Sequence, residues 1–379
     1  MAIGMVREPP ASWLDPWLDR RDRLLASPRF QRWASAFPLT RPLARRRARA
    51  LFDLCAGFVY AQVLSACVQL RLFDVLAEGP LSVPAIAARV SLSEEATERL
   101  LRAAASLRLI ERRRAERFGL GPLGAAMIGN PGIAAMVEHH RLLYHDLQDP
   151  VALLRGEQPD TELARYWPYA ASDRPADLTL QQVDAYSALM AASQPLVAEE
   201  VLDAYPLGRH RCLLDVGGGE GAFLAAAAAR SPQLQLILFD LPAVAERGEA
   251  RLAASGLAGR TTAVGGDFRT ELPAGADVVS LVRIVHDHDD ATALAVLRAA
   301  RRALPPDGTL LLAEPMSGTP GAEPVSDAYF GFYLLAMGRG RPRTPDELRT
   351  LLQAAGFDRV RLVPTRRPLL TRLMVGKPA

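Results

Sequence analysis

The sequence predicts a two-part chain: a mainly helical N-terminal half, then an α/β half built on a doubly wound, mostly parallel sheet of seven strands. Three observations predict this architecture. Seven short apolar runs in residues 211–379 are interspersed with helical patterns. The first run ends at a glycine-rich turn that opens into an alanine-rich helix. The last two runs follow each other with no helix between them.

Length and composition limit the architectures and functions that fit. At 379 residues and 49% hydrophobic, the chain can bury two cores, so we expect two domains. The net charge is only +3, but residues 1–49 hold eleven arginines against four acidic residues. The three cysteines, Cys55, Cys67 and Cys212, are odd in number and far apart. They predict neither a disulfide framework nor a metal site.

Residues 1–49 form an N-terminal arm that combines arginine with three of the four tryptophans, Trp13, Trp17 and Trp33. This composition suits a membrane surface, and it also suits packing against a dimer partner, which we favour. The uncharged run Leu54–Leu70 that follows is too short to span a bilayer comfortably. We interpret it as a buried amphipathic helix.

Residues 50–150 predict a domain with a winged-helix pattern. Ser82 and Ser93 are placed to cap two consecutive helices, and a short charged hairpin follows at residues 110–120. This pattern is often associated with DNA, but the second helix, residues 94–107, offers an acid-rich face that phosphate would avoid. We therefore predict a dimerisation domain and no nucleic-acid partner.

The rest of the chain divides into a helical linker, residues 151–205, that contributes to a pocket, and an α/β domain, residues 206–379. The strand candidates are Cys212–Val216, Leu236–Phe239, Thr262–Val264, Val278–Arg283, Leu310–Ala313, Val360–Val363 and Leu370–Val375. A helix is expected after each of the first five, and Thr344-Pro345-Asp346-Glu347 is a capping box. The last two strands must pair antiparallel, because a parallel pair needs a crossover. The result is a Rossmann-like sheet whose ligand belongs at the carboxyl ends of strands one, two and four.

The turn after the first strand predicts the ligand. Asp215 precedes Gly217-x-Gly219-x-Gly221, and the next strand ends at Asp240. These glycines also fit a dinucleotide fingerprint, but an acid at the strand tip would repel a pyrophosphate. Carboxylates attract a sulfonium and an amino group, the glycines let backbone approach the ligand, and Asp240 can accept both ribose hydroxyls. We therefore predict S-adenosylmethionine as the cofactor.

Candidate catalytic groups follow the fourth and fifth strands. His286-Asp287-His288 lies at the end of the fourth strand, and an imidazole with a pKa near ~6.5 can accept a hydroxyl proton near neutral pH. Glu314 ends the fifth strand and is placed to orient that imidazole. Asp267-Phe268, after the third strand, is placed to bind an adenine amine and ring, although it also fits an ordinary turn. The histidines likewise fit a solvated loop.

Together these residues resemble a known family, the S-adenosylmethionine-dependent O-methyltransferases of the plant caffeate and bacterial polyketide type. The resemblance covers about residues 50–379, and its segments are Tyr186-Ser187-Ala188-Leu189-Met190, Asp215–Gly221, Phe239-Asp240-Leu241-Pro242, Gly265-Gly266-Asp267-Phe268, His286-Asp287, Glu314 and Arg343-Thr344. A closer resemblance is to the bacterial demethylspheroidene (hydroxyneurosporene) O-methyltransferases of carotenoid synthesis. It rests on Ala50–Leu54, His139–Asp146, Phe332-Tyr333 and Gly340–Arg343.

The resemblance implies a homodimeric O-methyltransferase that acts on a hydrophobic hydroxylated small molecule. The implied substrate is the tertiary hydroxyl of a hydroxycarotenoid in the spheroidene and spirilloxanthin synthesis of photosynthetic bacteria. A polyketide or phenolic secondary metabolite is the alternative substrate. A ligand-binding winged-helix regulator with an inactive methyltransferase fold is the alternative of another class. The implied location is the cytoplasm, with peripheral contact at the inner photosynthetic membrane as a further option.

The resemblance also implies a role for each site residue. The cofactor-binding residues are Asp215, Gly217, Gly219, Asp240, Leu241, Asp267, Phe268, Arg283 and Ser193. The substrate-binding residues are Met190, Tyr186, Asp287, Phe330, Tyr333 and Met337, and the catalytic residues are His286, Glu314 and His288. Two departures from the family pattern matter: His288 stands where the family has Trp, and Pro342 stands where it often has an acid. They leave Glu314 to act alone and leave the base open between the two histidines.

Overall fold

The computed structural model describes residues 13–171 and 179–379. The chain forms two compact units, Met1–Pro122 and Leu123–Ala379. The first twelve residues of the predicted arm and residues 172–178 of the predicted linker lie outside the described residues. The chain divides between the units after Pro122, before the predicted domain boundary at residue 150, because the helix over residues 131–146 packs against the long helix over residues 180–204 within the second unit.

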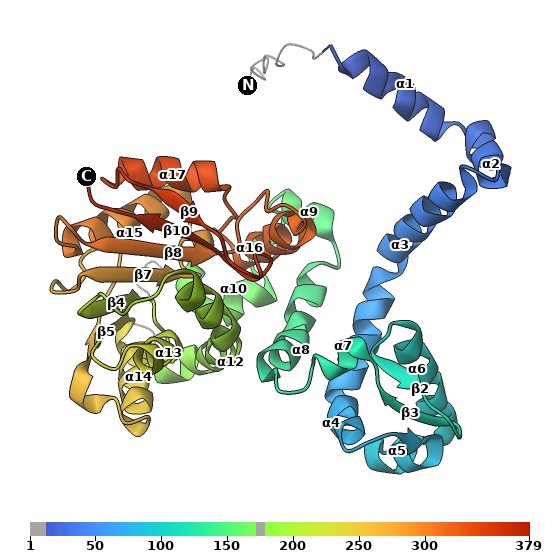
Figure 1. Ribbon diagram of the computed structural model, residues 1–379, viewed down its shortest axis with the longest axis horizontal. Coiled ribbons are helices and arrows are strands. Elements are labelled where there is room, and N and C mark those ends of the chain that lie inside the picture. Colours follow the sequence, from blue (N-terminus) through green and yellow to red (C-terminus); the bar gives the residue numbers. More distant parts are fainter. Residues whose placement is uncertain (1–12, 172–178) are drawn as a thin grey trace. The chain divides into compact units, whose positions relative to one another are not determined.

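The N-terminal unit carries the predicted winged-helix pattern (Figure 1). Its helices are α1 (Asp15–Ala26), α2 (Pro28–Ala36), α3 (Arg41–Gln69), α4 (Leu72–Ala77), α5 (Val83–Val90) and α6 (Glu94–Ser106). Its strands β1 (Leu81–Ser82), β2 (Ile110–Arg112) and β3 (Arg117–Leu120) form an antiparallel sheet in the order β1-β3-β2. The Ser93 hydroxyl caps α6 by accepting a hydrogen bond from the Ala96 N–H at 3.2 Å, as predicted. A short helix, α7 (Pro122–Ala125), follows the hairpin.

Helix α3 differs from its prediction. It has 29 residues, and Phe52, Leu54 and Phe58 are exposed along it. Among the described residues it is the one helix that is long and apolar enough to cross a membrane by length and composition, and only 17% of its most apolar window is buried. The expectation of a buried helix is therefore wrong for the single chain. An apolar surface of this size marks an interaction face.

The C-terminal unit is a sheet covered by helices on both faces. Its strands are β4 (Cys212–Val216), β5 (Gln235–Asp240), β6 (Thr261–Gly265), β7 (Val278–Val282), β8 (Thr309–Glu314), β9 (Arg361–Val363) and β10 (Arg372–Gly376). Their order is β6-β5-β4-β7-β8-β10-β9, and β10 runs antiparallel to both neighbours. All seven predicted strands and the single reversed strand are confirmed.

The helices of this unit precede the sheet or connect its strands. They are α8 (Pro131–Asp146), α9 (Pro150–Leu154), α10 (Glu162–Tyr166), α11 (Pro168–Ala171), α12 (Leu180–Ala204), α13 (Ala222–Arg230), α14 (Pro242–Ala254), α15 (Asp290–Ala303), α16 (Phe330–Met337) and α17 (Pro345–Ala354). Short helical turns lie at η2 (Ala258–Arg260), η3 (Val285–Asp287) and η4 (Pro324–Tyr329). The expected helix after the third strand is wrong: residues 266–277 are turns and loop, where Pro273 and Gly275 disfavour a helix.

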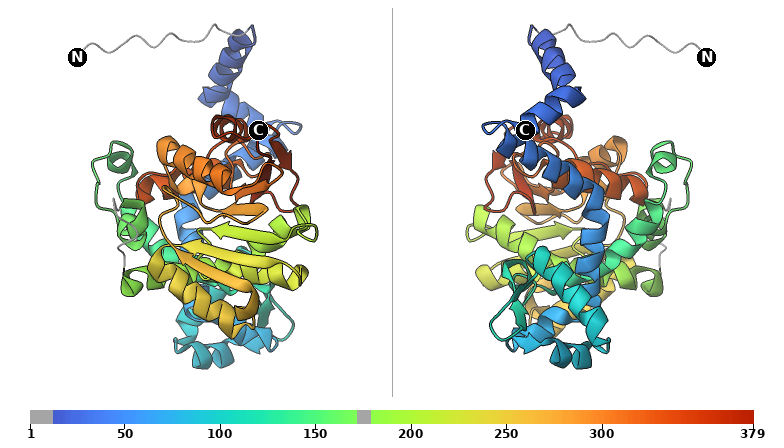
Figure 2. Two further views of the ribbon diagram at one scale, coloured as in Figure 1. Left: turned by 90° about the vertical axis from the view of Figure 1, so that its left-hand side faces the viewer. Right: turned by 90° about the vertical axis from the view of Figure 1, so that its right-hand side faces the viewer.

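Helices lie on both faces of the sheet (Figure 1 and Figure 2). Alternation along the strands builds two cores, one on each face. Leu214 and Val279 face α15 and α17, while Leu213 and Val278 face α12 and α13. Because both faces are filled, polar groups at the strand ends are left at the carboxyl edge of the sheet. The predicted capping box at the start of α17 is confirmed: the Thr344 hydroxyl accepts from the Glu347 N–H, and the Glu347 carboxylate accepts from the Thr344 N–H.

Candidate active site

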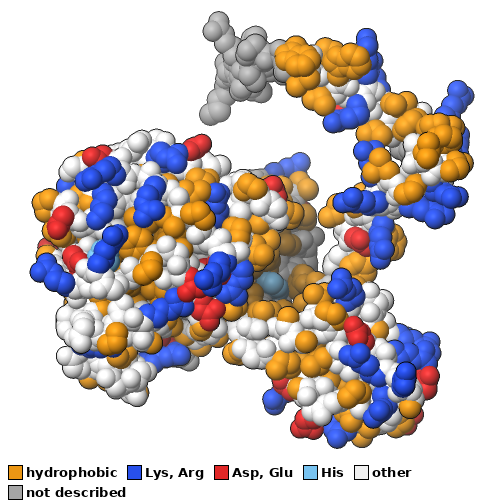
Figure 3. All heavy atoms as spheres, in the orientation of Figure 1, with side chains coloured by type: hydrophobic (Ala, Val, Ile, Leu, Met, Phe, Trp, Pro, Cys, Tyr) orange, Lys and Arg blue, Asp and Glu red, His pale blue; other side chains and the backbone are white. Residues whose placement is uncertain are grey.

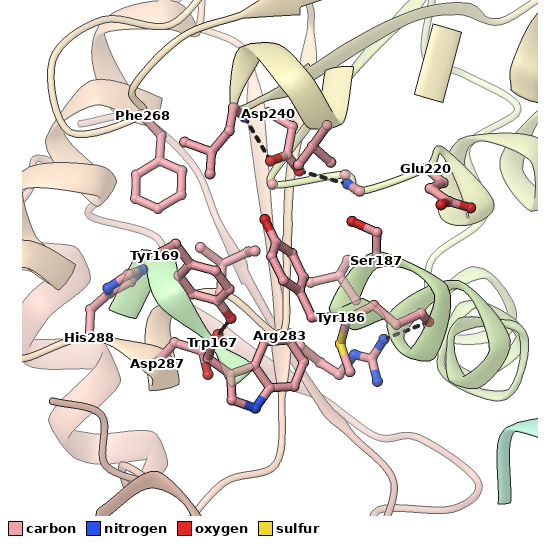
Figure 4. A pocket seen from close by; sticks show the side chains of 18 of the residues that line it. Trp167, Tyr169, Tyr186, Ser187, Glu220, Asp240, Phe268, Arg283, Asp287 and His288 are labelled. Atoms are coloured by element: carbon pink, nitrogen blue, oxygen red, sulfur yellow. Dashed lines mark hydrogen bonds between the residues drawn. The ribbon is translucent and has the colours of Figure 1, made fainter. Parts of the chain in front are cut away.

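A pocket lies at the carboxyl ends of the parallel strands in the C-terminal unit, where the sequence places the ligand. Its walls come from the turns after β4, β5, β6 and β7, together with α12 and residues 167–169. Figure 4 shows the aromatic side chains of Trp167, Tyr169 and Tyr186 reaching into this space, with Phe268 and His288 together at one end. The pocket is therefore polar along the strand tips and apolar along the helical side.

The glycine turn after β4 forms part of the pocket lining. Gly217 and Gly219 have φ values of +67° and +58°, which side chains other than glycine rarely adopt. A Cβ on Gly217 would lie 2.3 Å from the Ile284 side chain. The Gly217 N–H donates to the Phe239 carbonyl at 2.8 Å, which ties the turn to β5. These positions therefore need glycine, and they leave backbone open to a ligand.

Asp215 lies beneath this turn rather than in the pocket lining. Its carboxylate is buried and accepts a hydrogen bond from the Ser280 hydroxyl at 2.6 Å. A Cβ on Gly218 would stand 2.8 Å from the other carboxylate oxygen. Burial raises the pKa of the Asp215 carboxyl to about 7. The structure thus shows Asp215 supporting the turn, and direct contact with a ligand stays a prediction.

Asp240 is held at the tip of β5 with its carboxylate in the pocket. One oxygen accepts from the Gly219 N–H at 2.8 Å and the other from the Leu241 N–H at 2.7 Å. Burial raises the pKa of Asp240 to about 6, and the two backbone hydrogen bonds oppose that rise. Each oxygen keeps acceptor capacity, so the group can receive a pair of ligand hydroxyls.

Asp267 and Phe268 line the pocket after β6. The Asp267 carboxylate pairs with the Arg269 guanidinium at 2.6 Å, which helps to hold its pKa below the usual value although burial opposes this. The Phe268 ring meets the His288 ring edge-on, with centroids 5.4 Å apart. Figure 4 shows both rings bordering one end of the pocket, where a planar ring of a ligand could stack.

Arg283 brings a buried cation to the pocket. Its guanidinium donates to the Ser193 hydroxyl at 2.9 Å and to the Gln194 amide oxygen. Its Nε is buried without a hydrogen-bond partner, and burial lowers its pKa to about 10. Arg283 also has a φ of +59°, unusual for a residue with a side chain. Since its nearest partners are neutral, Arg283 can receive an anionic group, and Ser193 stands behind it rather than in the lining.

His286 and His288 occupy different places. His286 is buried in turn η3 outside the pocket lining, its Nε2 lies 3.3 Å from Asp287 Oδ1, and its ring centroid is 5.8 Å from that of Phe330. Burial, with the Arg283 cation, lowers the pKa of His286 to about 3. Burial lowers the pKa of His288, which does line the pocket, to about 4. Both imidazoles are therefore neutral near pH 7.

The side chain of Glu314 contacts the backbone of the turn that carries His286. Its carboxylate accepts from the His286 N–H at 3.0 Å, and among the described residues no hydrogen bond joins it to the imidazole. The prediction that Glu314 orients the ring directly therefore differs from this structure. At the end of β8 the Glu314 carboxylate is placed against a backbone N–H of the turn instead of against the imidazole. Burial raises the pKa of Glu314 to about 8.

The comparisons with known proteins agree with this geometry. Residues 144–358 match the O-methyltransferase domain family, and residues 52–130 match the O-methyltransferase dimerisation domain. Demethylspheroidene O-methyltransferase of Cereibacter sphaeroides is 48% identical over 91% of both chains, and that of Rhodobacter capsulatus is 40% identical over 93% of this chain and 88% of its own. The SAH-bound structure of CalO1, a methyltransferase in calicheamicin biosynthesis, has a TM-score of 0.65 and 29% identity, covering 88% of this chain and 98% of its own.

The chain belongs to the S-adenosylmethionine-dependent O-methyltransferases. The predicted cofactor and fold are thereby confirmed, and the dimerisation match supports the predicted homodimer. The pocket of this O-methyltransferase fits the cofactor at three points. Asp240 suits the ribose, the rings of Phe268 and His288 suit the adenine, and the unpaired Nε of Arg283 suits the methionine carboxylate.

The residues expected to bind substrate fall into two groups. Tyr186, Met190 and Asp287 line the pocket of the O-methyltransferase. Tyr333 and Met337 are buried one layer behind it, and the Tyr333 hydroxyl accepts from the Trp167 indole N–H at 2.9 Å. Contact of Phe330, Tyr333 and Met337 with the substrate stays a prediction.

Sequence reasoning missed Tyr169 and Gln194. The Tyr169 hydroxyl donates to Asp287 Oδ2 at 2.9 Å, and the Gln194 amide oxygen accepts a hydrogen bond from the Arg283 guanidinium. The signal for Tyr169 was the Trp167-Pro168-Tyr169 cluster, in which two aromatic side chains flank a proline. Gln194 has no such signal, because an amide in a helix is ordinary.

Proposed function

We propose that this O-methyltransferase methylates the tertiary hydroxyl of a hydroxycarotenoid of the demethylspheroidene or hydroxyneurosporene type, in the spheroidene and spirilloxanthin branch of carotenoid synthesis. The observation that carries the proposal is the 48% identity, over 91% of both chains, to a demethylspheroidene O-methyltransferase. The apolar side of the pocket supports it, because Trp167, Tyr186 and Met190 present surface suited to a polyene.

The buried groups suggest how the hydroxyl is deprotonated. The cofactor supplies a methyl group on a positively charged sulfonium. A tertiary alcohol is too weak an acid to ionise beforehand, so its O–H bond must break while the new O–CH₃ bond forms. The proposed acceptor of that proton is the neutral imidazole of His286, which lies just outside the pocket lining, beside the lining residue Asp287 and the ring of Phe330. Asp287, 3.3 Å from its Nε2, would stabilise the imidazolium, and Glu314 would hold the turn that carries it.

A transfer assay tests the proposal. The purified protein is incubated with methyl-labelled S-adenosylmethionine and a panel of tertiary hydroxycarotenoids, hydroxylated polyketides and phenols. We expect label on the carotenoid alcohols alone. Label on a phenol or polyketide would contradict the substrate but not the enzyme class. Cofactor binding without transfer to any of them would favour an inactive ligand-binding protein.

A further inference from the structure

We propose that residues 13–49, the Trp/Arg arm, bind the surface of a bilayer that contains anionic phospholipids. The arm comprises α1, α2 and the first turns of α3, in the N-terminal unit. Among the described residues, those that line the pocket all belong to the C-terminal unit, so the pocket lining gives the arm no part in methyl transfer. The proposal therefore stands or falls independently of the substrate.

Helix α1 presents apolar side chains that the chain itself does not cover. None of its residues is buried; Trp17, in its first turn, is 65% exposed, and Trp13, just before the helix, is 79% exposed. Trp17 and Leu24, seven residues apart, lie on one side of the helix. The acidic residues of α1 share the opposite side at spacings of four and three: Asp15, Asp19 and Asp22. A helix of this kind can lie in the plane of a membrane surface with its acids turned to water.

Helix α2 continues the apolar surface with aromatic rings. The ring of Trp33 lies 5.6 Å from that of Phe30 and 5.1 Å from that of Phe37, with the latter pair stacked. Trp33 is 51% exposed, and Leu39 beyond it is also exposed. Exposed Trp and Phe are the side chains that settle at the boundary between headgroups and acyl chains.

Arginines surround these rings and give the arm its charge. Residues 27–52 contain seven arginines and no acidic residue, and the run Arg45-Arg46-Arg47 is exposed. Figure 3 shows basic and hydrophobic side chains interspersed over α1, α2 and the start of α3. Each arginine near an anionic surface contributes about 1 kcal/mol at physiological salt. The arm thus combines apolar anchors with a charge that anionic lipid headgroups complement.

A second copy of the chain, which the composition alone favours as the arm's partner, fits this surface less well. If the arm packed on the same arm of a two-fold partner, the arginines of one arm would oppose those of the other. The dimerisation match covers residues 52–130 and begins where the arginines end. A dimer interface over these residues explains why the apolar half of α3 is exposed in the single chain. It does not explain the exposed apolar residues of the arm, which precedes it in the sequence.

Vesicle co-sedimentation with the full-length protein tests the proposal. We expect binding to phosphatidylcholine vesicles containing phosphatidylglycerol, weaker binding at high salt, and little binding to phosphatidylcholine alone. Replacing Arg45, Arg46 and Arg47 by Gln should weaken binding on the order of 100-fold. The matched control replaces the exposed run Arg112-Arg113-Arg114 by Gln in the same unit and should bind as the unchanged protein does.

The apolar anchors are tested in the same way. Trp13→Ser with Trp17→Ser should weaken vesicle binding about tenfold or more. Leu154→Ser with Leu369→Ser, two exposed apolar residues of the other unit, should have no effect. Absent binding, or equal binding to both vesicle types, would overturn the proposal. So would dissociation of the dimer by the tryptophan changes in light scattering, since the arm's partner would then be a second copy.

Discussion

Burial controls the protonation of the single residues around the pocket. It lowers the pKa of His286 to about 3, and it raises the pKa of Asp240 to about 6 and that of Glu314 to about 8. Such shifts gather where a site must handle charge without bulk water. The individual roles of these groups can be separated by substitution.

The first prediction concerns the base. If His286 accepts the hydroxyl proton, His286→Ala should lower kcat about 10²–10⁴-fold and leave cofactor affinity almost unchanged. His288→Ala should lower kcat much less and weaken cofactor binding, since His288 packs on Phe268 in the pocket. Steady-state kinetics and calorimetry on both variants check this. The reverse pattern would make His288 the base, and full activity of both would leave proximity to the methyl donor as the main source of rate.

A second prediction concerns the ribose contact. Asp240→Ala should weaken S-adenosylmethionine binding by about 1–3 kcal/mol, through loss of hydrogen bonds to a charged acceptor. Isothermal titration calorimetry measures the change. Asp358→Ala removes an exposed carboxylate far along the chain and serves as the control. Unchanged affinity in Asp240→Ala would remove the ribose role.

The third prediction follows from the raised pKa of Glu314. In the unfolded chain this carboxyl titrates near ~4.3, whereas in the folded protein its pKa is about 8. Between these values the folded state keeps a proton that the unfolded state loses, so the free energy of unfolding falls as pH rises. Buried histidines with lowered pKa values, such as His286 and His288, oppose this until about pH 7.5, because their pKa in the unfolded chain is near ~6.5; above that pH they are neutral in both states.

Thermal unfolding without cofactor should therefore show a Tm that decreases from about pH 7.5 to about pH 8.5. Glu314→Gln should flatten that decrease, and the smaller slope that remains near pH 7.5 comes from Asp215 and Asp287, whose pKa values burial raises to about 7. An identical slope in Glu314→Gln and the unchanged protein would contradict the assignment.

At the scale of elements, the turn η3 depends on the segment before α17. Arg343 is fully buried, and its guanidinium donates to the Val285 carbonyl at 2.8 Å and to the His288 carbonyl at 2.7 Å. It also pairs with Asp290 at 2.8 Å at the start of α15. One side chain therefore bridges both ends of the turn that carries His286.

Replacing this arginine is the fourth prediction. Arg343→Met should cost about 2–5 kcal/mol in the free energy of unfolding, because two buried carbonyls lose their donor. Urea denaturation measures the loss, and kcat should fall as the turn loosens. Arg349→Met breaks an exposed pair with Asp346 and should change stability by less than about 0.5 kcal/mol. Equal stability of the two variants would show that the bridge is unimportant.

At the scale of the whole molecule, the exposed apolar half of α3 predicts that the single chain is not the final state. Leu54→Asp should raise the dimer dissociation constant about 10²–10⁴-fold, because a two-fold interface contains the substituted position twice. Light scattering at micromolar concentration should show monomers. Leu369→Asp, exposed in the other unit, should stay dimeric. A dimer that survives Leu54→Asp would place the interface elsewhere.

The strands, the glycine turn and the caps could be predicted from the sequence because their causes are local. Short apolar runs identify β4 to β10, the spacing of Gly217 and Gly219 identifies the turn, and Thr344 with Glu347 forms a cap within four residues. The same local patterns predicted that Asp240, Phe268 and His288 lie at one edge of the sheet, and they predicted the cofactor site at that edge.

Only the tertiary structure decided which groups meet at that edge. It brings the Asp215 carboxylate to the Ser280 hydroxyl beneath the turn and the Arg283 guanidinium to the Ser193 hydroxyl. It also brings the Tyr169 hydroxyl to Asp287, and Glu314 to the backbone N–H of His286 rather than to its ring. These partners are separated by 28 to 118 residues in the chain. Their contacts depend on how whole elements pack, and no spacing rule in the sequence records that. The exposure of α3 was hidden for the same reason, since an apolar helix has one composition whether its own chain or a second copy covers it.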